Sequence, residues 1–245
     1  MDKLIVRASP KSPVSEAYRT LRTNIQFSNL DHELKSILFT SAMAGEGKTT
    51  TIINLGIVVA KSGKRVLIVD SDLRKPTIHK HFEMVNIRGL SELLLEDGEP
   101  TDYIVKSSVE GLDLLLSGTI PPNPSEMLGS RRMMILTEKL RREYDLIFFD
   151  APPVGIVTDA QILSTIVDGT ILVLAAEKTD KREALYAVSL LENVNCKLIG
   201  TVLNRIPMKE SGYYQYRHRA YYDQNDDETK GIRGLLLRMR RFYQK

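Results

Sequence analysis

The feature that most constrains the fold is a glycine-containing turn between an apolar strand pattern and an apolar helix pattern. Residues 36–40 read SILFT, residues 42–49 read AMAGEGKT, and a helical pattern follows from Lys48 to Ser62. With Ala42 in the first glycine's place, the turn matches the phosphate loop G-x-x-x-x-G-K-[ST]. Its glycines let backbone N–H groups face phosphate oxygens, and the helix N-terminus favours anions. The sequence therefore predicts nucleotide binding where a strand meets a helix.

Apolar runs and helical patterns alternate along the rest of the chain. This alternation predicts an α/β protein with a mostly parallel central sheet and helices on both faces. With the phosphate loop, the expected class is the P-loop fold. The polar, tyrosine-rich segment near the end of the chain is expected to be a mobile tail. The expected strands cover residues 36–40, 66–70, 112–116, 145–150, 170–175 and 197–203. The expected helices cover residues 12–30, 48–62, 89–96, 125–143, 159–167 and 181–194.

Changes of composition divide the chain into four expected segments. They are an N-terminal arm with a helix (1–35), the P-loop domain (36–206), a polar tyrosine-rich tail (207–230) and a basic amphipathic extension (231–245). The first residues lack the apolar stretch of a secretory signal, and Cys196 as the single cysteine excludes a disulfide framework. We therefore expect a cytoplasmic protein.

Charge is placed unevenly. The net charge is only +3, and residues 206–245 hold nine Lys/Arg against five Asp/Glu. The body therefore has no basic footprint for nucleic acid, and we expect no nucleic-acid partner. In residues 231–245 an apolar arc faces several arginines, which is typical of an interfacial helix. We expect peripheral membrane contact there, with docking onto the protein itself or a partner as the alternative.

Acidic residues end two of the expected strands. Asp70 and Asp72 follow the run VLIV, and Asp150 follows LIFF. Ligands of open α/β sheets bind at the carboxyl ends of the strands, and a carboxylate there can hold a metal ion beside a nucleotide. The alternative role is capping of the next helix. Beside a phosphate loop we favour the metal site.

The last part of the chain holds a cluster of tyrosines. Five of the chain's ten tyrosines lie within ten residues of polar sequence, and they are Tyr213, Tyr214, Tyr216, Tyr221 and Tyr222. Core tyrosines usually come with aliphatic neighbours, which this segment lacks. Exposed phenols on a tether suit a phosphoacceptor tail, and an adhesive surface is the alternative.

Together these features resemble the bacterial tyrosine kinases of capsule and exopolysaccharide assembly. That family's Walker A, Walker A′ and Walker B motifs correspond to AMAGEGKT, VLIVDSDLR and IFFDAPP, and its tyrosine cluster to the tail. Its Glu-x-x-Arg-x-x-Arg oligomerisation motif corresponds to Glu16, Arg19 and Arg22. The likeness includes SGTIPPNPSEML and runs through nearly all of residues 10–222. Ala44 stands where the family usually has a proline, so we expect a slightly less stiff loop.

The resemblance implies ATP and Mg²⁺ as cofactors and assigns the site residues. Lys48 would hold phosphates, Asp72 would orient or deprotonate the incoming phenol, and Asn204 would read the adenine. The implied catalytic residues are Lys48, Asp70, Asp72 and Asp150, with Thr49, Asp70 and Asp150 as metal ligands. The implied ATP-binding residues are Ala44, Gly45, Glu46, Gly47, Lys48, Thr49, Thr50 and Asn204.

The resemblance also implies partners. We expect tyrosine phosphorylation between neighbouring copies in a ring, an octamer by resemblance, with control of capsule or exopolysaccharide synthesis and export. A membrane-embedded adaptor of the polysaccharide co-polymerase type would activate the kinase and hold it at the inner face of the cell membrane. A cognate tyrosine phosphatase would complete the system.

Two other functions stay open at this point. One is an ATPase switch of the MinD/ParA kind, whose signature lysine would fall at position 43, where this chain has Met43. The other is an ATP-loaded scaffold whose tail only binds a partner. We interpret Lys178, Lys181 and Arg182 as the solvated start of a helix.

Overall fold

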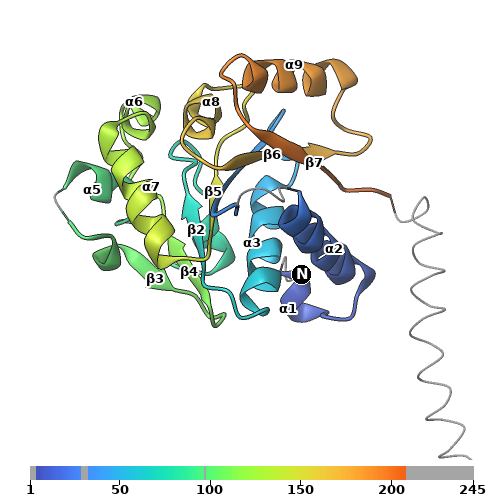
Figure 1. Cartoon of the computed structure of the whole chain (residues 1–245), viewed down its shortest axis with the longest axis horizontal. Coiled ribbons are helices and arrows are strands. Elements are labelled where there is room, and N and C mark those ends of the chain that lie inside the picture. Colours follow the sequence, from blue (N-terminus) through green and yellow to red (C-terminus); the bar gives the residue numbers. More distant parts are fainter. Residues whose placement is uncertain (1–3, 29–32, 97, 208–245) are drawn as a thin grey trace, which may run out of the picture. The chain divides into compact units, whose positions relative to one another are not determined.

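A seven-stranded sheet organises the part of the chain that the computed structural model describes, residues 4–28, 33–96 and 98–207 (Figure 1). The strand order is β3-β4-β2-β5-β1-β6-β7, and every neighbouring pair is parallel except β3 with β4. The strands are β1 (Ser36–Ser41), β2 (Val66–Asp70), β3 (Ile104–Lys106), β4 (Leu112–Leu115), β5 (Leu146–Asp150), β6 (Gly169–Ala175) and β7 (Leu198–Asn204).

Helices cover both faces of this sheet (Figure 1). One apolar core joins the sheet to α1, α2 and α3, and the other joins it to α5, α7, α8 and α9. The helices are α1 (Ile5–Ala8), α2 (Pro13–Phe27), α3 (Lys48–Ala60), α4 (Ile78–His81), α5 (Leu90–Leu95), α6 (Pro124–Leu128), α7 (Arg131–Glu143), α8 (Asp159–Ser164) and α9 (Lys181–Glu192), with a 3-10 turn η1 (Pro100–Asp102). Because both faces are covered, every residue of β1 and β2 is buried.

All six predicted strands are present, and the parallel α/β class is confirmed. Strand β3 was missed because it is a three-residue, partly exposed edge strand, too short to show a pattern. The single helix predicted over 125–143 is wrong, since Ser130 starts a second helix there. Its hydroxyl accepts a hydrogen bond from the Met133 N–H at 3.2 Å. At α2 the predicted cap is confirmed, because the Ser12 hydroxyl accepts from the Ser15 N–H at 3.2 Å.

Strand order brings three strand ends together. Strand β5 lies between β2 and β1, and Asp70 of β2 stands in register with Asp150 of β5. The loop that follows β1 leads into α3 at the same, carboxyl edge of the sheet. The topology therefore gathers the predicted phosphate loop and both acidic strand ends in one place.

The chain divides into two units, residues 1–205 and 206–245. All helices and strands given above belong to the first. The tyrosine cluster and the basic extension lie outside the described residues. Among the residues that are described, no helix combines the length and apolarity needed to cross a lipid bilayer.

Candidate functional site

The turn from β1 into α3 has the backbone of a phosphate loop. Gly45 has φ 79° and Gly47 has φ 91°, both in the left-handed region that favours glycine. Gly47 is the N-cap of α3, so the first helical residues are Lys48, Thr49 and Thr50. Free N–H groups at a helix N-terminus attract anions, and this loop is therefore suited to phosphate.

Lys48 and Thr49 both contact the end of β5. The Lys48 ammonium donates to one oxygen of Asp150, and the Thr49 hydroxyl donates to the other at 2.7 Å. Both Lys48 and Asp150 are buried, and the Lys48 ammonium also lies 4.0 Å from a carboxylate oxygen of Asp72. Lys48 thus lies within ion-pair distance of two of the other predicted catalytic side chains, Asp72 and Asp150.

Asp70, the fourth, is completely buried. Its Oδ2 accepts hydrogen bonds from the N–H groups of Thr77 at 3.2 Å and Ile78 at 3.1 Å, while its Oδ1 has no hydrogen-bond partner among the described residues. Burial, together with the neighbouring Asp150 carboxylate, raises the pKa of Asp70 to about 8. A buried oxygen of this kind favours a cation beside it.

This donor set fits Mg²⁺ held together with a nucleotide. The orphaned oxygen of Asp70, the Asp150 carboxylate and the Thr49 hydroxyl are hard oxygen ligands. Mg²⁺ commonly takes one or two carboxylates and completes its shell with phosphate oxygens and water. No group of three or more His, Cys, Asp or Glu side chains in the described ranges could hold a metal ion.

Asp72 is the third carboxylate of this site, and only a small part of it reaches the surface. It is 9% exposed, and its Oδ1 accepts a hydrogen bond from the Lys75 N–H at 3.0 Å. Burial raises the pKa of Asp72, and the Lys48 ammonium opposes that rise. Its carboxylate is therefore oriented by the backbone, and its pKa stays above the ordinary value.

An ion pair that the sequence did not reveal supports the segment carrying Asp72. Arg74 donates from Nε and Nη2 to the two carboxylate oxygens of Asp159, at 2.9 and 3.0 Å. Asp159 is the first residue of α8 and is completely buried. A bidentate pair of this geometry ties the segment after β2 to α8. Local patterns do not indicate this pair, because its two residues lie 85 positions apart.

Other predicted residues surround the loop. Ala44 and Gly45 are exposed, Glu46 is buried, and Thr50 is half-buried on the first turn of α3. Asn204, at the end of β7, donates from Nδ2 to the Glu46 carbonyl at 2.9 Å. Asn204 therefore lies beside the loop, while its proposed contact with adenine stays a prediction.

Lys178 corrects the sequence interpretation. It was expected at the solvated start of a helix, but α9 begins only at Lys181. Lys178 lies in the preceding turn, where its ammonium donates to the Ala44 carbonyl at 3.3 Å. The next residue, Thr179, donates its hydroxyl to the Glu46 carboxylate. The missed feature is a contact across 134 positions of sequence, which local patterns do not encode.

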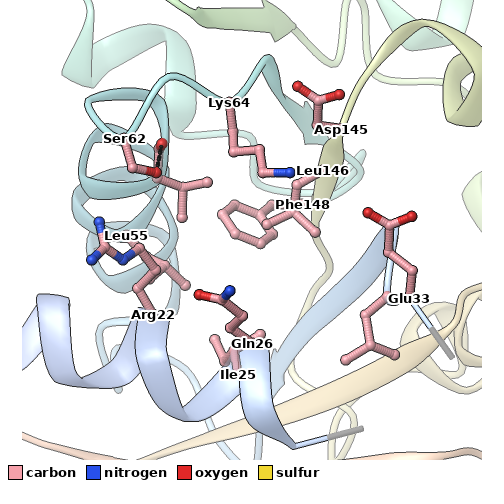
Figure 2. A pocket seen from close by; sticks show the side chains of 12 residues that line it. Arg22, Ile25, Gln26, Glu33, Leu55, Ser62, Lys64, Asp145, Leu146 and Phe148 are labelled. Atoms are coloured by element: carbon pink, nitrogen blue, oxygen red, sulfur yellow. Dashed lines mark hydrogen bonds between the residues drawn. The ribbon is translucent and has the colours of Figure 1, made fainter. Parts of the chain in front are cut away.

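The predicted oligomerisation residues lie on α2, which packs against α3. Arg19 pairs with Glu16 of the same chain at 2.5 Å. Arg22 lines a pocket of about 510 Å³ at the amino end of the sheet, opposite to Asp150, and Figure 2 shows it there with Gln26 and Lys64. Contact between copies through these residues stays a prediction.

Comparison with known proteins gives consistent matches. The family model described as an AAA domain matches residues 21–197. Tyrosine-protein kinase YwqD of Bacillus subtilis (strain 168) is 43% identical over 213 residues, which cover 87% of this chain and 90% of YwqD. The crystal structure of the chimerical protein CapA2B2 has 43% identity and a TM-score of 0.81, over 84% of this chain and 91% of that one. The kinase domain of Escherichia coli tyrosine kinase ETK has 32% identity and a TM-score of 0.80, over 83% and 80%.

Proposed function

This chain belongs to the bacterial tyrosine kinases, and from that premise we propose that it transfers the γ-phosphoryl group of ATP to tyrosines of its own carboxyl-terminal cluster. It is a protein-tyrosine kinase. The expected acceptors are Tyr213, Tyr214, Tyr216, Tyr221 and Tyr222.

One observation carries the proposal. Lys48, Thr49 and the carboxylates of Asp70, Asp72 and Asp150 converge at the carboxyl edge of the sheet, beside a loop whose backbone suits phosphate. Phosphoryl transfer needs positioning and charge neutralisation more than covalent chemistry from the protein. This site offers both.

The chemistry of each side chain suggests its role in phosphoryl transfer. The loop N–H groups and Lys48 would bind the phosphates, and Thr49, Asp70 and Asp150 would hold Mg²⁺. When bound, Mg²⁺ supplies positive charge that offsets the charge developing on the transferred group. Asp72 would accept a hydrogen bond from the tyrosine hydroxyl and take up its proton. A phenol with a pKa of about 10 is mostly protonated at neutral pH, so such an acceptor is useful.

We further propose that the reaction occurs between copies. A tail on one copy would enter the site of its neighbour in a ring held partly by Glu16, Arg19 and Arg22. Each phosphate adds about −1.5 to −2 charges, so accumulating phosphates would repel and loosen the ring. A membrane-embedded adaptor would activate the kinase at the inner face of the membrane, a phosphatase would reverse the modification, and the cycle would regulate capsule or exopolysaccharide synthesis.

Mixing two full-length variants tests transfer between copies. The first carries Lys48→Met and an intact tail, and the second keeps the site but has all five cluster tyrosines replaced by phenylalanine. With Mg²⁺ and labelled ATP, and with the adaptor present, neither variant alone should label its tail, whereas the mixture should label the Lys48→Met copy. A mixture without label would refute transfer between copies.

The alternative of an ATPase switch is tested in the same reactions. Met43 occupies the position of the signature lysine that such switches use, which argues against this function. A switch releases inorganic phosphate and leaves every tyrosine unmodified. Mass spectrometry of the tail peptides distinguishes the two outcomes.

A further inference from the structure

The phosphate loop accepts hydrogen bonds from side chains that lie more than 130 positions later in the sequence. The Lys178 ammonium donates to the Ala44 carbonyl at 3.3 Å, and the Asn204 amide donates to the Glu46 carbonyl at 2.9 Å. Lys178 lies between β6 and α9, and Asn204 ends β7, which pairs with β6. Two carbonyls of the loop, two positions apart, are therefore bound by side chains that follow or end the neighbouring strands β6 and β7.

Because the peptide bond is planar, these contacts also fix the direction of the N–H groups that follow the two carbonyls. In a trans peptide the carbonyl and the following N–H point in opposite directions. Donors on the Ala44 and Glu46 carbonyls thus orient the N–H groups of Gly45 and Gly47 the opposite way. Those are the groups by which a glycine-rich loop binds phosphate.

The same side chains lie against both glycines of the loop. A Cβ on Gly45 would lie 3.2 Å from the Lys178 ammonium, and a Cβ on Gly47 would lie 2.1 Å from the Asn204 amide nitrogen. Both glycines also have positive φ. The contacts from outside therefore pack directly on the two residues whose N–H groups they orient.

Glu46 and Thr179 make a third contact. Glu46 is buried, and its Oε2 accepts a hydrogen bond from the Met43 N–H at 2.9 Å. Its other oxygen accepts from the Thr179 hydroxyl, which itself accepts from the Ala175 N–H at the end of β6, at 3.0 Å. This chain of hydrogen bonds joins the last residue of β6 to the interior of the loop.

We propose that Lys178, Thr179 and Asn204 form a loop clamp, a set of positioning residues that fix the direction of the loop N–H groups and so set the affinity for nucleotide. The clamp acts through the loop and needs no contact of Lys178 or Thr179 with the nucleotide. It rests on the proposed nucleotide site and adds residues that the phosphate-loop motif does not contain.

Single substitutions in the full-length chain test the clamp. Lys178→Met removes the charge, Thr179→Val removes the hydroxyl at similar size, and Lys178→Arg keeps a cation. Lys181→Met is the matched control, because Lys181 is an exposed lysine at the start of α9. The probe is Mg·ADP, with Kd measured by calorimetry at fixed ionic strength, and KM for ATP and kcat are measured alongside thermal unfolding.

The expected pattern follows from loss of one oriented donor. Lys178→Met and Thr179→Val should each raise Kd and KM by about fivefold, in line with a single hydrogen bond, while kcat at saturating ATP changes less than about twofold. Lys178→Arg should restore most of the affinity, and Lys181→Met should bind as the unmodified chain does. Because Lys178 is exposed, its variants should unfold at an unchanged temperature.

Three results would overturn the clamp. Unchanged Kd in both Lys178→Met and Thr179→Val would remove it while leaving the proposed function in place. An effect of Lys178→Met without one of Thr179→Val would instead indicate a direct contact of the lysine with the nucleotide. Failure of the unmodified chain to bind Mg·ADP would refute the proposed function, and the clamp with it.

Discussion

Replacing Lys48 by methionine tests the electrostatics of the site directly. The substitution removes the ammonium that contacts Asp150 and keeps similar length. Asp150 is completely buried, and it would keep only the Thr49 hydroxyl, at 2.7 Å, as a side-chain donor. We expect two separable effects, a loss of kinase activity and a loss of stability.

The loss in free energy of unfolding can be estimated from the burial of the Lys48–Asp150 pair. Removing one partner of a buried ion pair costs about 3–5 kcal/mol, because a charge is left buried without compensation. We expect the lower end, about 3 kcal/mol, because Asp150 keeps the hydrogen bond from the Thr49 hydroxyl. For a domain of this size each kcal/mol lowers Tm by about 2–4 °C, which gives a fall of about 6–12 °C.

A double-mutant cycle in urea is the assay. Lys48→Met is compared with Asp150→Asn and with the double variant, all as full-length chains. The double variant should recover about 2 kcal/mol of the loss, because it removes the unpaired charge as well. Kinase activity should stay absent in the double variant, which separates catalysis from stability. Lys61→Met, at the exposed C-cap of the same helix, serves as control and should change stability by less than about 0.5 kcal/mol.

Two outcomes would refute this reasoning. A Lys48→Met chain that unfolds within about 1 kcal/mol of the unmodified chain would show that the pair is not electrostatically strong. A double variant no more stable than Lys48→Met would show that the cost arises from lost packing of the lysine stem.

Three further predictions follow from other contacts. Chelation of Mg²⁺ should stop tyrosine phosphorylation. Asp70→Asn should raise the half-saturating Mg²⁺ concentration by about tenfold in a kinase assay. An unchanged value would exclude Asp70 as a ligand. Arg74→Met leaves Asp159 buried without its partner and should lower the free energy of unfolding in urea by about 2 kcal/mol. This figure is below that for a fully buried pair because the Arg74 side chain is 38% exposed. A loss below about 0.5 kcal/mol would contradict the pairing. Burial alone would raise the pKa of Glu92, but the hydrogen bonds from Thr119 and from backbone N–H groups together lower the pKa overall. The stability that Glu92 contributes is therefore lost as pH falls below about 5. Glu92→Gln should therefore flatten the dependence of Tm on pH between about 5 and 3, and equal slopes would refute the assignment.

Much of the site was visible in the sequence because its parts are local. The phosphate loop needs glycines and a lysine at set spacing where a strand meets a helix, so the motif predicts its own structure. The apolar runs before Asp70 and Asp150 predict buried strands. Because the carboxyl ends of parallel strands lie at the same edge of a sheet, both acids are predicted at that edge. Periodicity failed where an element was short, as at Ile104–Lys106, or where one cap divided a long pattern, as at Ser130.

Only the tertiary structure decided which of these parts touch. The order that places β5 between β2 and β1 sets Asp70 in register with Asp150, and a local pattern does not specify the order of strands. The pair of Arg74 with Asp159 and the contact of Lys178 with Ala44 join residues far apart in the chain. Local hydrophobic spacing reports which face of an element is buried, whereas the partner on that face is chosen by the packing of the whole domain.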